Sequence, residues 1–337
     1  IPDFAWGAME NLGAITYRES ALLVDPATAT RTELERVAAV IAHELAHMWF
    51  GDLVTMKWWN GIWLNEAFAT FMEMKCTEAF RPDWKIFLGA AADRAAAMEI
   101  DALATTRPVE FPVASPEEAN AMFDTLTYEK GSSVLRMLEQ YIGEETFRRG
   151  IGSYLAANAY GNTVTDDLWD ALEQASGEPV GEIMHGWIYQ GGFPQVMVEA
   201  AGDQWALRQE QFRYLGEGNG AWKVPVLYDG ADGAERVIVD EPVTIAPGDD
   251  ALVNAGGSGF YRVRYAPELL EAVADRLGEL EPEERYSVVS DTWANVLAGE
   301  VPAPEFIELV GGLYEESEPA VWRVALTGLA ELYRVAS

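Results

Sequence analysis

The chain has 337 residues, with 55 acidic against 23 basic side chains and a formal net charge of −32. Its length predicts more than one domain, because single hydrophobic cores seldom grow beyond about 250–300 residues. The acidic balance argues against nucleic acid or an anionic membrane as a partner. No apolar run reaches the roughly 18–20 residues of a membrane span. The one cysteine, Cys76, cannot form an internal disulfide, and its apolar helical surroundings predict a buried thiol.

The first part of the chain combines two strand-like pieces, at 14–17 and 21–24, with a long helical region. From about residue 32 to 187, apolar residues recur every three to four positions, as in helices that bury one face. The clearest runs are 33–54, 64–79, 84–102, 128–141 and 147–157, and a further helix is expected to begin near Thr165.

The second part begins after Gly191 and Gly192, where alternating apolar residues replace the helical spacing. Short strands separated by Gly and Asp turns predict a small antiparallel β-sandwich. They lie at 196–198, 204–212, 224–228, 237–239 and 260–265, and helical runs follow at 269–280, 285–298, 306–315 and 321–335. We therefore expect a multidomain α+β protein with a mostly helical domain over 1–192, a β-sandwich over 193–266 and a helical segment over 267–337.

Two of the three histidines lie four residues apart in His43-Glu44-Leu45-Ala46-His47, within a helical run. Four residues place both imidazoles on one helix face, about 6 Å apart, from where they can bind one metal ion. Glu44 can then reach a metal-bound water without being a ligand. Taken alone, this short motif leaves open a structural helix with two unrelated histidines.

A carboxylate eighteen residues after His47 strengthens the metal interpretation. Glu66 lies near the start of the next predicted helix, where it completes a set of two histidines and one glutamate. Three protein ligands leave one position open for water, which is typical of catalytic zinc sites. Glu73 lies seven residues further on the same helix face, and we expect it to orient a ligand imidazole.

These motifs resemble the gluzincin metallopeptidases, and within them the aminopeptidase N (membrane alanyl aminopeptidase) family. Gly7-Ala8-Met9-Glu10-Asn11 matches the family's exopeptidase signature, and Tyr128-Glu129-Lys130-Gly131 resembles its catalytic tyrosine motif. The resemblance covers residues 1 to about 265 well and the helical remainder loosely. It implies a thermolysin-like peptidase domain that binds one zinc ion through His43, His47 and Glu66.

The resemblance also implies the other site roles. Glu44 corresponds to the general base that deprotonates the zinc-bound water, and Tyr128 to the hydroxyl that stabilises the oxyanion. Glu10 corresponds to the carboxylate that pairs with the substrate's α-ammonium group. Gly7, Ala8 and Met9 would bind the substrate, the backbone of the first two as an added strand. Two positions depart from the family pattern near the metal: Gly61 replaces an acidic residue, and Ala67 replaces a glycine.

The resulting hypothesis is a zinc aminopeptidase that acts on peptides with a free N-terminus. A metalloendopeptidase with the same zinc chemistry, or a non-catalytic zinc-binding protein, are the alternatives. The resemblance further implies that this sequence is a fragment without the family's N-terminal domain and with a truncated C-terminal helical domain. We therefore expect weak activity from these residues alone, and a cytoplasmic location for the protein.

Overall fold

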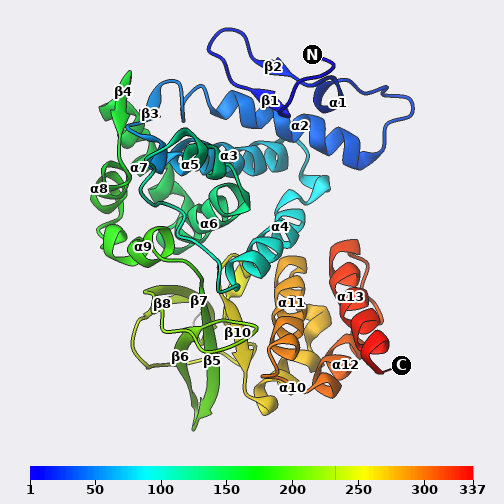
Figure 1. The fold of residues 1–337 in the computed structure, drawn as a ribbon. Helices are drawn as coiled ribbons and strands as arrows, with labels where there is room; N and C mark the ends of the chain where they lie inside the picture. The colour runs from blue at the N-terminus through cyan, green and yellow to red at the C-terminus, as the bar shows by residue number, and fades with distance from the viewer. Residues whose placement is uncertain (232, 337) are drawn as a thin grey trace. The chain divides into compact units, whose positions relative to one another are not determined.

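The computed structural model describes residues 1–231 and 233–336 (Figure 1). Contacts between residues divide the chain into two compact units. Unit 1 comprises residues 1–90 and 109–181, and unit 2 comprises residues 91–108 and the chain from 182 onward. Two helices, α4 (Ile86–Asp101) and α9 (Val180–Tyr189), begin in unit 1 and continue into unit 2. Mixed helix and sheet agree with the multidomain α+β class expected from the sequence.

Unit 1 consists mainly of helices, joined by two pairs of very short strands. The helices are α1 (Glu19–Leu22), α2 (Arg31–Ala46), α3 (Trp63–Phe80), α5 (Pro116–Ala121), α6 (Gly131–Ile142), α7 (Glu144–Asn158) and α8 (Thr165–Ser176), with short turns η1 (Trp59–Gly61) and η2 (Pro82–Trp84) and a π-helical turn, η3 (Leu126–Lys130). The strand β1 (Ala8–Met9) pairs antiparallel with β2 (Thr16–Tyr17), and β3 (Val54–Met56) pairs parallel with β4 (Gly161–Thr163).

Helix α3 is the central element of unit 1 and packs against both α2 and α6. Its first nine residues are all buried, including Trp63 and Phe68, which are at most 1% exposed. Bulky apolar side chains on all sides leave this first half of α3 without a solvent face, which favours a place in the interior. Glu66 belongs to this buried stretch, so its carboxylate lies inside the unit.

Two predicted elements of unit 1 differ clearly from the structure. The helix expected over 33–54 begins at a capping box between Thr30 and Glu33 and already ends at Ala46. The chain then turns through Gly51, whose φ of +138° is open only to glycine, and continues as β3. Residues 21–24, expected as a strand, include the end of the short helix α1. Apolar periodicity alone cannot distinguish these cases over so few residues.

An apolar groove of about 1160 Å³ runs along unit 1 between α2, α3 and α7. Val37 and Ile41 of α2 and Ile151 of α7 line it, together with Cys76 of α3. The prediction that Cys76 is buried was wrong, because this face of α3 is exposed in the groove. Among the described residues, no helix is both long and apolar enough to cross a membrane.

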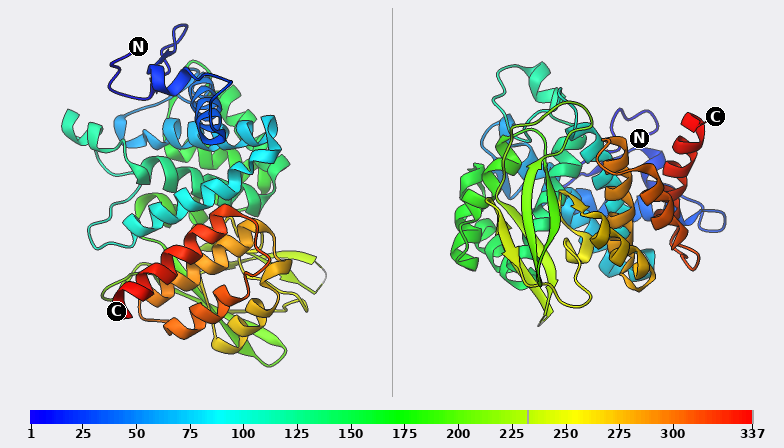
Figure 2. Two further views of the ribbon diagram at one scale, coloured as in Figure 1. Left: turned by 90° about the vertical axis from the view of Figure 1, so that its right-hand side faces the viewer. Right: turned by 90° about the horizontal axis from the view of Figure 1, so that it is seen from below.

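Unit 2 contains a four-stranded sheet, a hairpin and four helices that follow them in the chain. The sheet has the order β10 (Arg262–Tyr265), β5 (Pro194–Ala201), β6 (Gln204–Gln211) and β9 (Val243–Ile245), and β7 (Val224–Gly230) pairs with β8 (Gly233–Val239). The helices are α10 (Pro267–Asp275), α11 (Pro282–Leu297), α12 (Ala303–Gly311) and α13 (Pro319–Ala336), with short turns at η4 (Ala255–Gly257) and η5 (Leu277–Glu279). Figure 2 shows α13 lying alongside α11.

The pairing of β10 corrects the prediction of a purely antiparallel sandwich. Strands β5, β6 and β9 are antiparallel, but β10 runs parallel to β5, with Arg262 opposite Gln195. Side-chain alternation predicts which residues face the core, whereas strand direction depends on the connection. Here the chain passes through four other strands between β5 and β10, which is long enough for a parallel return.

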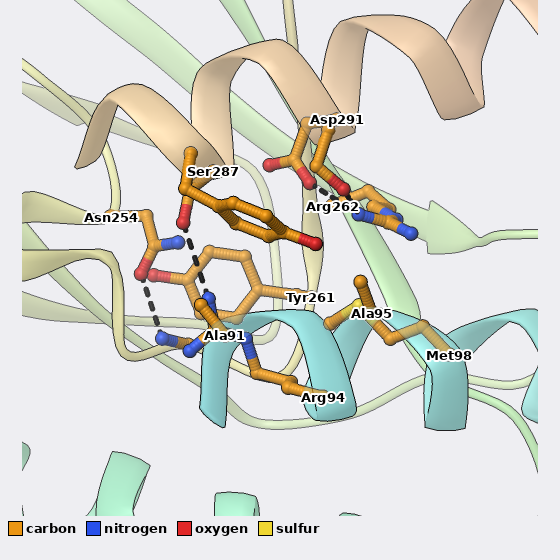
Figure 3. Close-up of a pocket in the computed structure, with 12 residues that line it drawn as sticks. Ala91, Arg94, Ala95, Met98, Asn254, Tyr261, Arg262, Ser287 and Asp291 are labelled. Carbon is orange, nitrogen blue, oxygen red and sulfur yellow. Dashed lines mark hydrogen bonds and ion pairs between the residues drawn. The ribbon is translucent and has the colours of Figure 1, made fainter. Parts of the chain in front are cut away.

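A buried ion pair joins the sheet of unit 2 to its helices (Figure 3). Arg262 of β10 and Asp291 of α11 are 4% and 5% exposed. Arg262 Nη1 donates to Asp291 Oδ1 and to Ser290 Oγ, both at 2.9 Å, and the amide of Val263 donates to Asp291 Oδ2 at 3.0 Å. Both carboxylate oxygens therefore have a donor, as a buried carboxylate requires.

Candidate metal centre

Helix α2 presents two imidazoles on consecutive turns, with ring centroids 4.8 Å apart. The Nδ1 atom of His47 lies 2.9 Å from the carbonyl oxygen of Phe50, and Nδ1 of His43 lies 3.0 Å from Glu73 Oε2. The Phe50 carbonyl can only accept a hydrogen bond, and so can an ionised Glu73 carboxylate. In each neutral ring the proton is therefore on Nδ1. The Nε2 atoms of both histidines are thereby left with lone pairs.

Helix α3 supplies a third acceptor opposite these two nitrogens. Glu66 Oε2 lies 3.5 Å from His43 Nε2 and 3.4 Å from His47 Nε2, and the three residues form a possible metal site. These separations are longer than the 2.7–3.2 Å typical of N–H···O hydrogen bonds. Tetrahedral ligands at zinc bond lengths of about 2.0–2.2 Å lie about 3.3–3.6 Å apart. The two distances from Glu66 fall in this range, and the three ligand atoms lie within 4.8 Å of one another, as one bound metal ion requires.

The charges at this centre favour a cation as well. Burial alone would lower the pKa of His43, but its contacts with Glu66 and Glu73 outweigh this effect and raise that pKa to about 10. Burial would raise the pKa of Glu66, but its contacts with both histidines outweigh this effect and lower that pKa to about 2. Both shifts show that the site stabilises positive charge beside Glu66, which a proton or a bound metal ion can supply.

Glu44 lies beside the metal-ligand candidates with an unsatisfied oxygen. The residue is 6% exposed, and its Oε2 has no hydrogen-bond partner among the described residues. Burial raises the pKa of this carboxyl to about 7, although the nearby histidines act in the opposite direction. A buried carboxylate oxygen without a donor costs folding free energy. Such an oxygen is typical of a group that binds a water or a ligand. A pKa near neutrality is also suited to proton transfer.

Tyr128 faces the same centre from the π-helical turn η3. Its ring stacks on that of His43, with centroids 6.2 Å apart and planes 19° apart. Burial is the main cause that raises the pKa of the Tyr128 phenol, and the charge of Glu66 and a hydrogen bond with it act in the same direction. The hydroxyl therefore stays protonated and can donate a hydrogen bond. Single π-helical turns of this kind are frequent at functional sites.

The segment from Gly7 to Glu10 comprises the edge strand β1 and one residue on either side of it. The Gly7 carbonyl accepts from the Arg18 amide at 2.9 Å, so it is used within the β1–β2 hairpin. Because backbone groups alternate along a strand, the N–H and C=O groups of Ala8 point to the other edge. Met9 is 40% exposed. The charge of Glu10 acts on Glu44, His47 and Tyr128, which places its carboxylate near the centre.

The structure thus brings His43, Glu44, His47, Glu66, Glu73 and Tyr128 into one cluster in unit 1, with Glu10 close by. Sequence reasoning missed Asp52, whose Oδ2 is buried without a hydrogen-bond partner among the described residues. Burial and the charge of Glu10 raise the pKa of Asp52, and its amide donates to the His47 carbonyl at 3.0 Å. The only signal for it was an acidic residue directly after Gly51, five positions past His47.

Comparison with known proteins finds similar sequences along nearly the whole chain. Residues 1–187 match the model of the peptidase family M1 domain, and residues 251–337 match an ERAP1-like C-terminal domain. The chain is 40% identical over 335 residues to the tricorn protease-interacting factor F2 of Thermoplasma acidophilum, covering 99% of this chain and 42% of that protein. It is 40% identical over 352 residues to a puromycin-sensitive aminopeptidase of Caenorhabditis elegans (98% and 37%). A leucyl aminopeptidase of Saccharolobus solfataricus is 39% identical over 324 residues (94% and 41%). The chain thus spans about two fifths of the length of these relatives.

Proposed function

Because this chain belongs to peptidase family M1, we propose that unit 1 carries the catalytic site of a zinc aminopeptidase, which hydrolyses the N-terminal peptide bond of peptides. We propose a thermolysin-like peptidase domain over 1–192, followed by a β-sandwich domain over 193–266 and a helical segment from 267. The observation that carries the proposal is that Glu66 Oε2 lies 3.5 Å from His43 Nε2 and 3.4 Å from His47 Nε2, next to the unpartnered oxygen of Glu44.

One zinc ion per chain is proposed to bind to His43 Nε2, His47 Nε2 and Glu66. Zinc held there would supply Lewis-acid chemistry, polarising the scissile carbonyl and making a bound water more acidic. Glu73 and the Phe50 carbonyl hold the two imidazoles in the orientation and tautomer that binding requires.

The proton transfers are assigned to Glu44. Its carboxylate accepts a proton from the attacking water while the water oxygen bonds to the carbonyl carbon. The same group returns that proton to the leaving amine nitrogen as the C–N bond breaks. The Tyr128 hydroxyl donates a hydrogen bond to the carbonyl oxygen, on which negative charge develops.

Selection of a free N-terminus is assigned to Glu10. An ionised carboxylate near the scissile bond stabilises an α-ammonium group by a charge-assisted hydrogen bond. It also fixes the distance from the amine to the reacting carbonyl, so that only one residue precedes the cut. The free edge of β1 at Ala8 can hold the extended substrate backbone.

The proposal is tested with the chain loaded with stoichiometric zinc. One fluorogenic peptide is supplied with a free N-terminus and, in parallel, with an acetylated one. We expect cleavage of the free form alone, abolished by a chelator and restored by zinc. Glu10→Gln should remove most of this preference, since the amide carries no charge. Equal cleavage of both peptides by the wild type would replace the proposal with a metalloendopeptidase. Cleavage of neither, with zinc bound, would leave a zinc-binding unit without turnover.

A further inference from the structure

Gly131 and Ala67 lie in direct contact at the place where the helix of Glu66 meets the turn of Tyr128. A Cβ atom built on Gly131 would lie only 2.6 Å from Ala67 Cβ, below the 3.0 Å that real Cβ atoms keep. Both residues are buried, Ala67 at 0% exposure, so neither can yield toward solvent. Only a glycine at position 131 therefore fits opposite an alanine at position 67.

The backbone conformation of Gly131 gives no other reason for glycine. Its φ and ψ are −57° and −50°, ordinary helical values that any residue adopts. Glycine in a helix costs about 0.5–1 kcal/mol relative to alanine. The close approach of α3 to η3 and α6 is what the missing side chain makes possible.

Each side of this contact is covalently close to a residue of the metal centre. Ala67 directly follows Glu66 in α3. The Gly131 amide donates to the carbonyls of Leu126 and Tyr128, so Gly131 closes the π-helical turn that carries Tyr128. The separation of α3 and η3 at this point therefore sets the distance between the Tyr128 hydroxyl and Glu66.

We propose that the Ala67–Gly131 contact positions Tyr128 against the metal ligands, with Gly131 as a positioning residue for the reaction. The proposal rests on the role proposed above for Tyr128. A methyl group at position 131 pushes η3 away from α3 and takes the hydroxyl out of reach of the substrate carbonyl. The ligands His43, His47 and Glu66 lie on α2 and α3, so zinc binding is retained.

The alanine at position 67 makes the inference testable by a reciprocal change. Gly131→Ala creates the clash, and Ala67→Gly removes the atom that it clashes with. In the Ala67→Gly background, Gly131→Ala should therefore have little effect. The double variant moves one methyl group from position 67 to position 131, so the total side-chain volume at the contact is unchanged. A loss caused only by altered helix propensity would not recover in this way.

Two measurements report separately on the position of Tyr128 and on its contribution to turnover. The first is the ¹⁹F resonance of 3-fluorotyrosine placed at position 128 in the zinc-loaded chain, which does not require turnover. The second is kcat, KM and zinc stoichiometry with the free-amine peptide. Gly150→Ala serves as the matched control, because its Cβ would lie 2.7 Å from Leu172 Cδ2 between α7 and α8 instead.

We expect Gly131→Ala to shift the resonance by more than its linewidth and to lower kcat by about 10–100-fold, with KM and zinc stoichiometry kept. The double variant should restore the resonance and kcat to within about threefold of Ala67→Gly. If Gly131→Ala does not fold, the double variant tests the proposal: a resonance that matches Ala67→Gly supports it, and a shifted resonance overturns it. An unchanged resonance in Gly131→Ala, no recovery in the double variant, or an equal shift in Gly150→Ala would each overturn the proposal.

The proposed function can fail separately. If Tyr128→Phe keeps the wild-type kcat, the oxyanion role of Tyr128 is wrong, and the contact then positions a residue that the reaction does not use. If the wild-type chain shows no turnover, the resonance series still decides whether the contact sets the position of Tyr128.

Discussion

The two units each bury a cluster of charged side chains, but the clusters differ in how the carboxylates are satisfied. In unit 2, Asp291 receives donors on both oxygens at 2.9–3.0 Å, from Arg262 and the Val263 amide. In unit 1, Glu66 faces two imidazole nitrogens at 3.4–3.5 Å, and Glu44 keeps an oxygen without a partner among the described residues. Buried polar groups are costly when unsatisfied.

This difference separates a structural ion pair from a site prepared for a ligand. The Arg262–Asp291 pair links β10 to α11, although Arg262 Nε remains without a partner in the described chain. In the unit 1 cluster, two imidazole nitrogens face one carboxylate oxygen at distances that suit ligands of one metal ion. Variants of the two clusters should therefore affect different quantities: zinc and turnover in unit 1, and the free energy of unfolding in unit 2.

The largest effect is expected for Glu44→Gln. The amide cannot accept a proton from water, so kcat should fall by about 10²–10⁴-fold, while zinc stoichiometry stays at one. Turnover of the free-amine peptide and metal analysis measure the two quantities. Glu35→Gln, in the same helix, is the matched control and should keep activity. A Glu44→Gln variant within tenfold of the wild type would contradict the general-base assignment.

Asp291→Ala should cost about 3–5 kcal/mol in the free energy of unfolding, because it leaves the Arg262 guanidinium buried without its counter-charge. Urea unfolding followed by circular dichroism measures this cost, and zinc stoichiometry of the folded protein should not change. Replacing the pair together, as Arg262→Met with Asp291→Leu, should recover part of the loss. A zinc deficit in folded Asp291→Ala would mean that the two clusters are not independent.

Glu73→Ala should weaken zinc binding by about 10–100-fold, because His43 loses the acceptor that holds its ring and tautomer. Glu73→Gln should weaken it less, since the amide oxygen can still accept from Nδ1. Competition with a chromophoric chelator measures both affinities. Equal affinities for the wild type and Glu73→Ala would remove Glu73 from the account of the centre.

The smallest effect is expected at the exposed pair between Arg208 and Glu199, which is 3.2 Å long with side chains 45% and 54% exposed. Glu199→Gln should change the free energy of unfolding by less than about 1 kcal/mol, since water and salt screen the charges. The same urea experiment at low and high salt measures it. A loss of unfolding free energy similar to that of Asp291→Ala would show that burial does not explain the difference between the two ion pairs.

Much of the arrangement could be predicted from local patterns, as α2 illustrates. Its start follows from the capping box of Thr30 and Glu33, and the four-residue spacing of His43 and His47 places both imidazoles on one face. The end of α2 was predicted eight residues too late, because the apolar spacing continues past Ala46 into the turn at Gly51, whose φ of +138° is not helical. The parallel partner of β5 and the exposure of Cys76 were also missed, since both depend on segments distant in the sequence.

The residue types and spacings at the centre are visible in the sequence: two imidazoles four residues apart, a carboxylate between them, and further carboxylates at 66 and 73. Helix geometry places residues four or seven positions apart on one face, so these spacings bring the side chains of each helix together. The distance between α2 and α3 depends instead on tertiary packing, which places Glu66 3.4–3.5 Å from both imidazoles. Tertiary packing also places Tyr128 on a π-helical turn next to α3, at a separation that leaves no room for a methyl group on Gly131.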